Sequence, residues 1–234
     1  MTESSTGSAK SRVAVIVAHP DDEVLAFGGS ICRHAAAGDS VSILIMASGL
    51  TSRAESATPV PKELAELRAQ GQKAAQLMGA AAIQFADFPD NRMDGVDLLD
   101  VVKRIEAFLA ETQADTVYTH HQGDLNIDHG VVARAVLTAS RPLPGAGVKR
   151  LYAGEVLSSS EYALVQDRFQ PDTYVNIDAY LERKCRALEC YRDEIRAWPH
   201  PRSVEAITAQ ARLRGSESGF AAAEALKLLR EIRP

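Results

Sequence analysis

The segment "RVAVIVAHPDDE", residues 12–23, joins an apolar run directly to a histidine and three carboxylates. The run is rich in β-branched residues and apolar on both faces, which is typical of a buried parallel strand. In open α/β folds, ligands bind just beyond the carboxyl ends of such strands. Because Asp21, Asp22 and Glu23 would repel one another there, the segment indicates that a metal ion lies among them.

The rest of the chain repeats this alternation of short β-branched runs and longer helical patterns. Strands are predicted at 12–18, 40–47, 81–88 and 114–120, and weaker β segments at 149–160 and 173–178. Helices are predicted at 23–38, 61–80, 95–113, 131–141 and 179–195, the last one capped by Asp178. Two more helices are predicted, one before and one after "RGSESGF" (214–220). This order predicts an α/β fold, a Rossmann-like three-layer sandwich with a mostly parallel sheet.

Composition narrows the class of protein. The 234 residues are 46% hydrophobic and 24% charged, which predicts one domain over 12–234 after a disordered polar tail at 1–11. The net charge of -5 includes no basic block, so no nucleic-acid partner is expected. Three cysteines without a CxxC pair predict a reduced, cytoplasmic protein, and no segment is long and apolar enough to predict a membrane partner. A homo-oligomer stays open.

Two distant polar segments should meet at one edge of this sheet. "AHPDDE" (18–23) leaves the first predicted strand, and "HHQGDLNIDHG" (120–130) leaves the fourth. Because the carboxyl ends of parallel strands open on the same side, we expect the two loops to share one site.

Histidine and carboxylate side chains in these loops are suited to a transition metal. His19, Asp22 and His129 would supply two imidazoles and one carboxylate, a ligand set found for catalytic zinc, although another divalent transition metal is possible. Such a cation polarises a water molecule and a carbonyl oxygen. Asp21 lies beside these ligands without being one of them, so it is a candidate general base. Together these groups predict amide hydrolysis.

The sequence resembles the PIG-L or LmbE-like deacetylases, zinc-dependent hydrolases that remove acetyl groups from N-acetylglucosamine-type sugars. The resemblance covers nearly the whole chain, and it implies the same three zinc ligands and the same base. Its motifs are "AHPDDE" at 18–23 and "DLNIDHG" at 124–130, with support from "FPDNRMD" at 88–94 and "RGSESGFAAAEAL" at 214–226.

One position departs from the family pattern. Many members carry a histidine where this chain has Asn126, and that histidine is thought to stabilise the oxyanion and to protonate the leaving amine. An asparagine amide donates a hydrogen bond but cannot deliver a proton. Proton delivery stays open between Asp21 and a histidine from the end of the fourth strand, His120 or His121. Asp128 is expected to orient a neighbouring group, plausibly a histidine.

Further residues are candidates for substrate contacts because they follow predicted strands. Arg53 lies after the second strand, where a solvated arginine is an equally good account. Arg92 lies after the third strand, where a substrate role is favoured over ordinary turn chemistry. At the end of the fourth strand, His121 is assigned to catalysis and His120 to substrate binding. One of the two is expected to reach the site.

We therefore expect a zinc-dependent N-deacetylase whose partner is a small-molecule acetamido sugar or its conjugate. Two alternatives stay open: another metal-dependent amidase or esterase on the same scaffold, and a metal- or nucleotide-binding module without catalysis. A dinucleotide loop is disfavoured because "FGGS" (27–30) lacks the GxGxxG spacing, so these glycines predict close helix packing instead.

Overall fold

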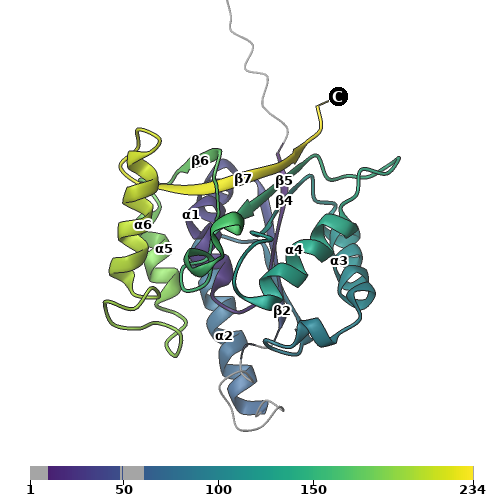
Figure 1. Cartoon of the computed structure of the whole chain (residues 1–234), viewed down its shortest axis with the longest axis horizontal. Helices are drawn as coiled ribbons and strands as arrows, with labels where there is room; N and C mark the ends of the chain where they lie inside the picture. The colour runs from purple at the N-terminus through teal and green to yellow at the C-terminus, as the bar shows by residue number, and fades with distance from the viewer. Residues whose placement is uncertain (1–9, 48, 50–60, 234) are drawn as a thin grey trace, which may run out of the picture.

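The computed structural model describes residues 10–47, 49 and 61–233, and in this part of the chain one seven-stranded sheet forms the centre (Figure 1). The strand order is β3-β2-β1-β4-β5-β7-β6, in which β1 to β5 pair in parallel and β7 is antiparallel to both of its neighbours. The predicted fold class is thereby confirmed. The strands are β1 (Arg12–Val17), β2 (Ser40–Ala47), β3 (Ala82–Phe88), β4 (Thr116–His120), β5 (Arg150–Gly154), β6 (Thr173–Asn176) and β7 (Ala223–Glu231).

Helices cover both faces of the sheet. Helices α1, α2 and α5 pack on one face, with α6 beside α5 and β7, and helices α3 and α4 pack on the other (Figure 1). None of the helices in the described residues is both long and apolar enough to cross a membrane. Their bounds are α1 (Asp22–Ala37), α2 (Pro61–Met78), α3 (Leu98–Thr112), α4 (Ile127–Ala139), α5 (Leu181–Leu188) and α6 (Val204–Ser216), with short 3-10 turns η1 (Met93–Gly95), η2 (Ser160–Tyr162) and η3 (Val165–Asp167).

Strand β1 shows why the first apolar run belongs at the centre of the sheet. Val13, Val15 and Val17 pack into the core beneath α1, α2 and α5. The alternate residues Ala14 and Ile16 pack into the core beneath α3 and α4. Successive side chains of a strand point to opposite faces, so a strand covered by helices on both sides must be apolar throughout.

Close packing also accounts for one of the two adjacent glycines in α1. A Cβ atom added to Gly29 would lie 2.5 Å from a methyl carbon of Ile177, the residue that follows β6. Any side chain at this position would therefore push the two elements apart. This contact agrees with the predicted packing role.

The last third of the chain differs from its prediction. The segment after residue 220 is predicted to form a helix, because alanine, leucine, glutamate and lysine all favour helices. Residues Ala223–Glu231 form strand β7 instead, which pairs with β5 on one side and with β6 on the other. The two ladders of tertiary hydrogen bonds outweigh local propensity. Asp178 is likewise not a helix cap: its carboxylate accepts the backbone N–H of Ala222, just before β7.

One further expectation concerns the N-terminal end of the described residues. The predicted tail at 1–11 lies mostly outside the described residues, which begin at residue 10. Ser11, its last residue, donates its backbone N–H to Asp39 Oδ1 at 2.9 Å and is therefore held in place beside β1.

Candidate metal centre and active site

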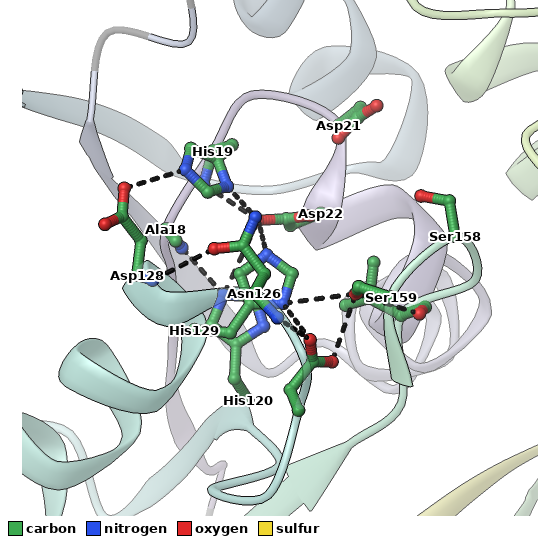
Figure 2. A network of polar contacts seen from close by, with 12 residues as sticks. Ala18, His19, Asp21, Asp22, His120, Asn126, Asp128, His129, Ser158 and Ser159 are labelled. Atoms are coloured by element: carbon green, nitrogen blue, oxygen red, sulfur yellow. Dashed lines mark hydrogen bonds and ion pairs between the residues drawn. The ribbon is translucent and has the colours of Figure 1, made fainter. Parts of the chain in front are cut away.

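The two polar loops meet as the strand-end rule predicts. Strands β1 and β4 are parallel neighbours, so the turn after Val17 and the loop after His120 open at the same edge of the sheet. His19, Asp22 and His129 converge there, and one ligand atom from each lies within 4.8 Å of the others (Figure 2). All three residues are buried.

The turn into α1 sends its two aspartates in different directions. Asp21 has a left-handed backbone, with φ 100°, and its carbonyl oxygen accepts the N–H groups of Val24 and Leu25. A left-handed backbone is costly for most residues, and aspartate is among those that tolerate it. As a result Asp22 points into the cluster, whereas Figure 2 shows Asp21 set apart from it.

Helix α4 begins inside the second motif, four residues earlier than predicted. Asn126 occupies the cap position, where its Oδ1 accepts the backbone N–H of Asp128 at 2.9 Å. Asparagine is one of the preferred N-cap residues. The cap places Asp128 and His129 in the first helical turn, so a rigid element rather than a loop positions both side chains.

The cluster contains buried polar atoms without hydrogen-bond partners. Asp22 Oδ2 lies 3.4 Å from His19 Nδ1 and 3.2 Å from His129 Nε2. Among the described residues, however, neither Asp22 Oδ1 nor His129 Nε2 makes a hydrogen bond. Such atoms are rare in folded proteins and call for an explanation. Two imidazoles and one carboxylate at this spacing fit a zinc-type cation, which would satisfy both atoms.

In His19 and His129, the ring nitrogen that does not face Asp22 contacts another carboxylate. Asp128 Oδ2 lies 3.0 Å from His19 Nε2, which is the kind of contact predicted for Asp128. Asp124 Oδ1 lies 3.2 Å from His129 Nδ1. Such carboxylate–histidine pairs orient the ring and strengthen it as a ligand. The sequence analysis assigned no role to Asp124, although its place in the same motif as His129 was a usable signal.

A second group of possible ligands lies on the far side of His19. Asp90 Oδ1 is 3.4 Å from His19 Nε2, and His19, Asp90 and Asp128 also form a set whose ligand atoms lie within 4.8 Å. Here Asp128 is already occupied, because its two oxygens accept the backbone N–H groups of Asn91 and Met93. The first group, with its unpartnered atoms, is therefore the better candidate for a metal.

Burial and neighbouring charges shift the pKa values of His19, His129 and Asp22 in opposite directions. Burial alone would lower the pKa of His19, but contacts with Asp128 and Asp22 outweigh it and raise the pKa to about 10. The pKa of His129 is raised in the same way, by Asp22 and Asp124 against burial. Burial would raise the pKa of Asp22, yet the two histidines hold it well below its usual range. Without a metal, the two histidines therefore favour their protonated, positively charged form, and Asp22 favours its ionised form.

Of the two histidines at the end of β4, His120 reaches the cluster, with its Nε2 3.5 Å from Asp22 Oδ2, and His121 does not. His120 is fully buried, accepts the Ala18 N–H at 2.7 Å and stacks on His129 with ring centroids 3.9 Å apart. It has no exposed surface for the predicted substrate contact. His121 donates to the carbonyl oxygen of Asp167 and contacts Phe169, so its ring is held by a neighbouring loop rather than in the cluster. Neither position suits the role assigned from sequence.

Arg202 is a residue of the site that the sequence analysis missed. Its Nη1 lies 3.1 Å from Asp21 Oδ2, and the same atom donates to Glu194 Oε2 at 2.6 Å. Burial raises the pKa of Asp21 well above its usual range, and the positive charge of Arg202 opposes that rise. Both Arg202 and Glu194 follow α5, far along the chain from the two motifs. No pattern in that segment signalled the contact.

The predicted substrate arginines have different outcomes. Arg53 lies outside the described residues. Arg92 follows β3 and is exposed. Its neighbour Asn91 accepts a hydrogen bond from Asn126 Nδ2 at 2.9 Å, which brings the end of β3 to the site. The substrate role of Arg92 stays a prediction.

Comparison with known proteins identifies the family. Residues 14–140, from β1 to the end of α4 and including both motifs, match the PIG-L family, described as GlcNAc-PI de-N-acetylase. The chain belongs to this family of deacetylases that act on N-acetylglucosamine-type substrates.

Three relatives illustrate its range. The chain is 25% identical over 189 residues to "Probable N-acetyl-alpha-D-glucosaminyl L-malate deacetylase 2" of Bacillus cereus, covering 79% of this chain and 84% of that protein. It is 27% identical over 200 residues to 4-oxalmesaconate hydratase of Pseudomonas putida, covering 80% and 75%. The crystal structure of the conserved protein TT1542 from Thermus thermophilus has the same fold, with a TM-score of 0.77, 23% identity and coverage of 96% and 97%.

Proposed function

We propose that this protein is a zinc-dependent hydrolase that removes the N-acetyl group from an acetamido sugar of the N-acetylglucosamine type, or from a conjugate of one. The observation that carries the proposal is the buried ligand set of His19, Asp22 and His129 in a chain of the PIG-L family, in which Asp22 Oδ1 and His129 Nε2 make no hydrogen bond within the described residues. The Bacillus cereus relative, named as a deacetylase of a glucosaminyl conjugate, supports the substrate class.

His19, Asp22 and His129 would hold the metal. Two neutral imidazoles and one carboxylate leave a divalent ion with a net positive charge, and zinc is the expected metal, with another divalent transition metal as the alternative. When bound, such an ion acts as a Lewis acid that polarises the substrate carbonyl and makes water more acidic. Asp128 and Asp124 orient the two histidines from behind.

Asp21 is the proposed general base. It adjoins the ligand Asp22 in the chain and is not itself in the ligand set, so its carboxylate can take a proton from the attacking water. Its burial makes the protonated form more accessible than in an exposed aspartate, which suits a group that must hold a proton and then release it.

Asn126 is the proposed partner of the carbonyl oxygen as negative charge develops on it. One N–H of its Nδ2 donates a hydrogen bond to Asn91 Oδ1, and the second N–H can donate a hydrogen bond to the substrate. Asn126 has no proton to transfer, His120 is buried with its Nε2 accepting the Ala18 N–H, and His121 donates to the Asp167 carbonyl oxygen, so we assign proton delivery to Asp21. It would return to the leaving amine the proton that it took from water, giving acetate and a free amino sugar.

A second candidate function rests on the hydratase relative. The Pseudomonas putida protein is named for adding water to an unsaturated acid, so the family fold can direct a water molecule at a carbon–carbon double bond as well as at an amide. The same metal cluster would serve either reaction. A conjugated dicarboxylic acid should then lose its ultraviolet absorbance on incubation with the protein, whereas an acetamido sugar would yield no acetate.

The direct test combines metal analysis with an acetate-release screen. The panel should contain acetylated amino sugars, their nucleotide-linked forms, other amide conjugates and acetate esters. We expect zinc in the wild type, acetate from at least one amino sugar, loss of zinc in His129→Ala and loss of turnover in Asp21→Ala. His34→Ala, a change at the other end of α1, is the matched control. An active Asp21→Ala protein, or full zinc in His129→Ala, contradicts the proposal.

The same screen separates the remaining alternatives. Preference for amide conjugates or acetate esters over acetylated amino sugars points to a different hydrolase on the same scaffold. Zinc binding without turnover of any compound in the panel points to a binding module.

A further inference from the structure

We propose that Arg202 is a positioning residue for Asp21, and that Glu194 and Ser158 in turn fix Arg202. The inference rests on the proposed function, because it concerns the residue that we assign as the base. It adds to the two sequence motifs a third element, the segment between α5 and α6, without which the site would be incomplete.

Asp21 has few restraints of its own. Its side chain is fully buried, yet among the described residues neither carboxylate oxygen makes a hydrogen bond. A hydrogen bond would fix the direction of a carboxylate, because its geometry is directional. The contact that holds Asp21 is the ion pair with Arg202, at 3.1 Å. The orientation of the proposed base therefore depends on where this guanidinium lies.

Arg202 is restrained at three points. Its Nη1 donates to Glu194 Oε2 at 2.6 Å, its Nε donates to Ser158 Oγ at 2.9 Å, and its backbone N–H donates to His200 Nδ1 at 3.0 Å. The planar guanidinium keeps its donors in a fixed arrangement, so contacts at Nε and Nη1 set the orientation of the whole group.

Ser158 contributes through an unusual backbone. It follows β5 in a left-handed conformation, with φ 83°, which is uncommon for a residue with a side chain. Its N–H donates to Glu161, and its Oγ accepts from Arg202. Figure 2 shows Ser158 on the side of the site where Asp21 lies, away from the histidines. Such strained residues persist where the surrounding structure requires them.

The position of Arg202 favours a role in orientation over one in metal binding. Its side chain is 19% exposed, so solvent screens its attraction to Asp21 only in part. Among the described residues it pairs with Asp21 and Glu194 rather than with His19 or His129. Loss of Arg202 should therefore leave zinc in place and let the base move.

The test compares the kinetics of Arg202→Ala with those of Asp21→Asn and of the double variant, on whichever acetamido sugar the wild type turns over. A misplaced catalytic group typically costs about 10²-fold in rate. We expect kcat of Arg202→Ala to fall by about that factor while KM changes by less than about threefold and zinc content stays unchanged. In the Asp21→Asn background, removing Arg202 should cost less than about threefold, because there is no base left to orient.

Two further measurements distinguish orientation from a general loss of structure. Added guanidinium should restore part of the kcat of Arg202→Ala, whereas methylammonium, which lacks the planar fork, should restore less. Arg202→Lys keeps the charge and should lie between the wild type and Arg202→Ala. Arg196→Ala changes an arginine of the same segment whose bonds go to Asp193 and Ile195 carbonyls, and it should behave as the wild type.

The outcomes separate this inference from the function on which it rests. Wild-type kcat in Arg202→Ala, an equal loss in the Asp21→Asn background, or loss of zinc in Arg202→Ala would each overturn the positioning role while leaving the deacetylase proposal standing. A wild type that releases no acetate from any acetamido sugar would overturn the proposed function, and the positioning role with it.

Discussion

Helix α1 contains the buried acidic group of Asp22 and donates hydrogen bonds to that of Glu224 from β7, and the two groups differ in their polar contacts. At its first turn, Asp22 is fully buried and its Oδ1 makes no hydrogen bond within the described residues. Farther along the helix, Glu224 of β7 is also buried, but its oxygens accept from the Gly29 and Ser30 N–H groups, from Ser30 Oγ and from Lys184 Nζ. In Asp22 only Oδ2 has polar partners, whereas both oxygens of Glu224 accept hydrogen bonds.

The difference shows that burial of a charge does not by itself mark a functional site. Burying an ionised group is costly unless other groups pair with it. Glu224 and Lys184 meet that cost with groups from the chain itself, and so they join α1, α5 and β7 as a structural cluster. The groups around Asp22 leave its Oδ1 without a hydrogen bond in the described residues, so a partner from outside the chain is needed. We infer that a metal ion fills this role.

The largest expected effect is that of Asp22→Ala on activity. A bound metal contributes several kcal/mol to the transition state, so its loss should lower kcat/KM by about 10³-fold or more. Zinc content should fall with it, and the metal-free protein should unfold at a lower urea concentration, because the change removes the carboxylate that pairs with His19 and His129 and accepts the His19 N–H. Metal analysis and urea unfolding check both points. Full zinc in Asp22→Ala would remove the distinction between the two clusters.

Glu224→Ala should lower the stability of the protein but leave the metal in place. The change leaves Lys184 buried without its carboxylate, which typically costs about 3–5 kcal/mol in the free energy of unfolding. Adding Lys184→Met should recover much of that loss, because an apolar side chain needs no ionic partner. Urea unfolding of the single and double variants measures the loss of unfolding free energy and its recovery. Zinc binding by the folded protein should persist. Equal stability of Glu224→Ala and the wild type would show that the pair is not structural.

Asn126 sharpens the comparison because it has one structural and one proposed catalytic function. In Asn126→Ala the cap of α4 is lost, at a cost of about 1 kcal/mol in unfolding free energy. The oxyanion donor is lost too, which should lower kcat by about 10²-fold. Asn126→Asp is the matched control, since aspartate caps a helix but has no N–H to donate. If Asn126→Asp keeps wild-type kcat, the amide is not an oxyanion donor.

The smallest expected effect is a pH dependence confined to the metal-free protein. The folded pKa of His19, about 10, lies above its ordinary value of 6.5. The contribution of His19 to the free energy of unfolding is therefore complete below about pH 6.5 and is lost as the pH rises toward 10. The slope of this loss is at most about 1.4 kcal/mol per pH unit. Buried His120 has a folded pKa of about 3, so its contribution has the opposite sign and is lost as the pH falls below 6.5.

Urea unfolding between pH 5 and pH 9, with a chelator or with zinc, measures these slopes. Zinc competes with protons for His19, so the loss of stability above about pH 6.5 should disappear when zinc is present. Identical pH profiles in both conditions would show that no metal binds at this histidine.

The part of the site that lies directly after the parallel strands could be predicted from the sequence. Asp22 and His129 lie just beyond strands β1 and β4, and parallel strands bring such positions together whatever their distance along the chain. Asn126 was identified as a departure from the family pattern, but its use as a helix cap was not, because the start of α4 was placed too late.

Residues contributed by the last third of the chain could not be predicted in the same way. The segment that forms β7 has the composition of a helix, and only its two neighbouring strands give it an extended form. Arg202 reaches Asp21 from an irregular segment, where neither hydrophobic periodicity nor the strand-end rule indicates which side chain faces the site. Contacts of this kind depend on tertiary packing and become visible only in the structure.

The most direct test of the account is anomalous diffraction at the zinc absorption edge, from crystals of the protein purified with zinc. The account predicts one strong peak per chain, within bonding distance of His19, Asp22 and His129, with Asp21 beside it and unbound. A peak between His19, Asp90 and Asp128 instead, or no peak in crystals of protein that releases acetate, would contradict it.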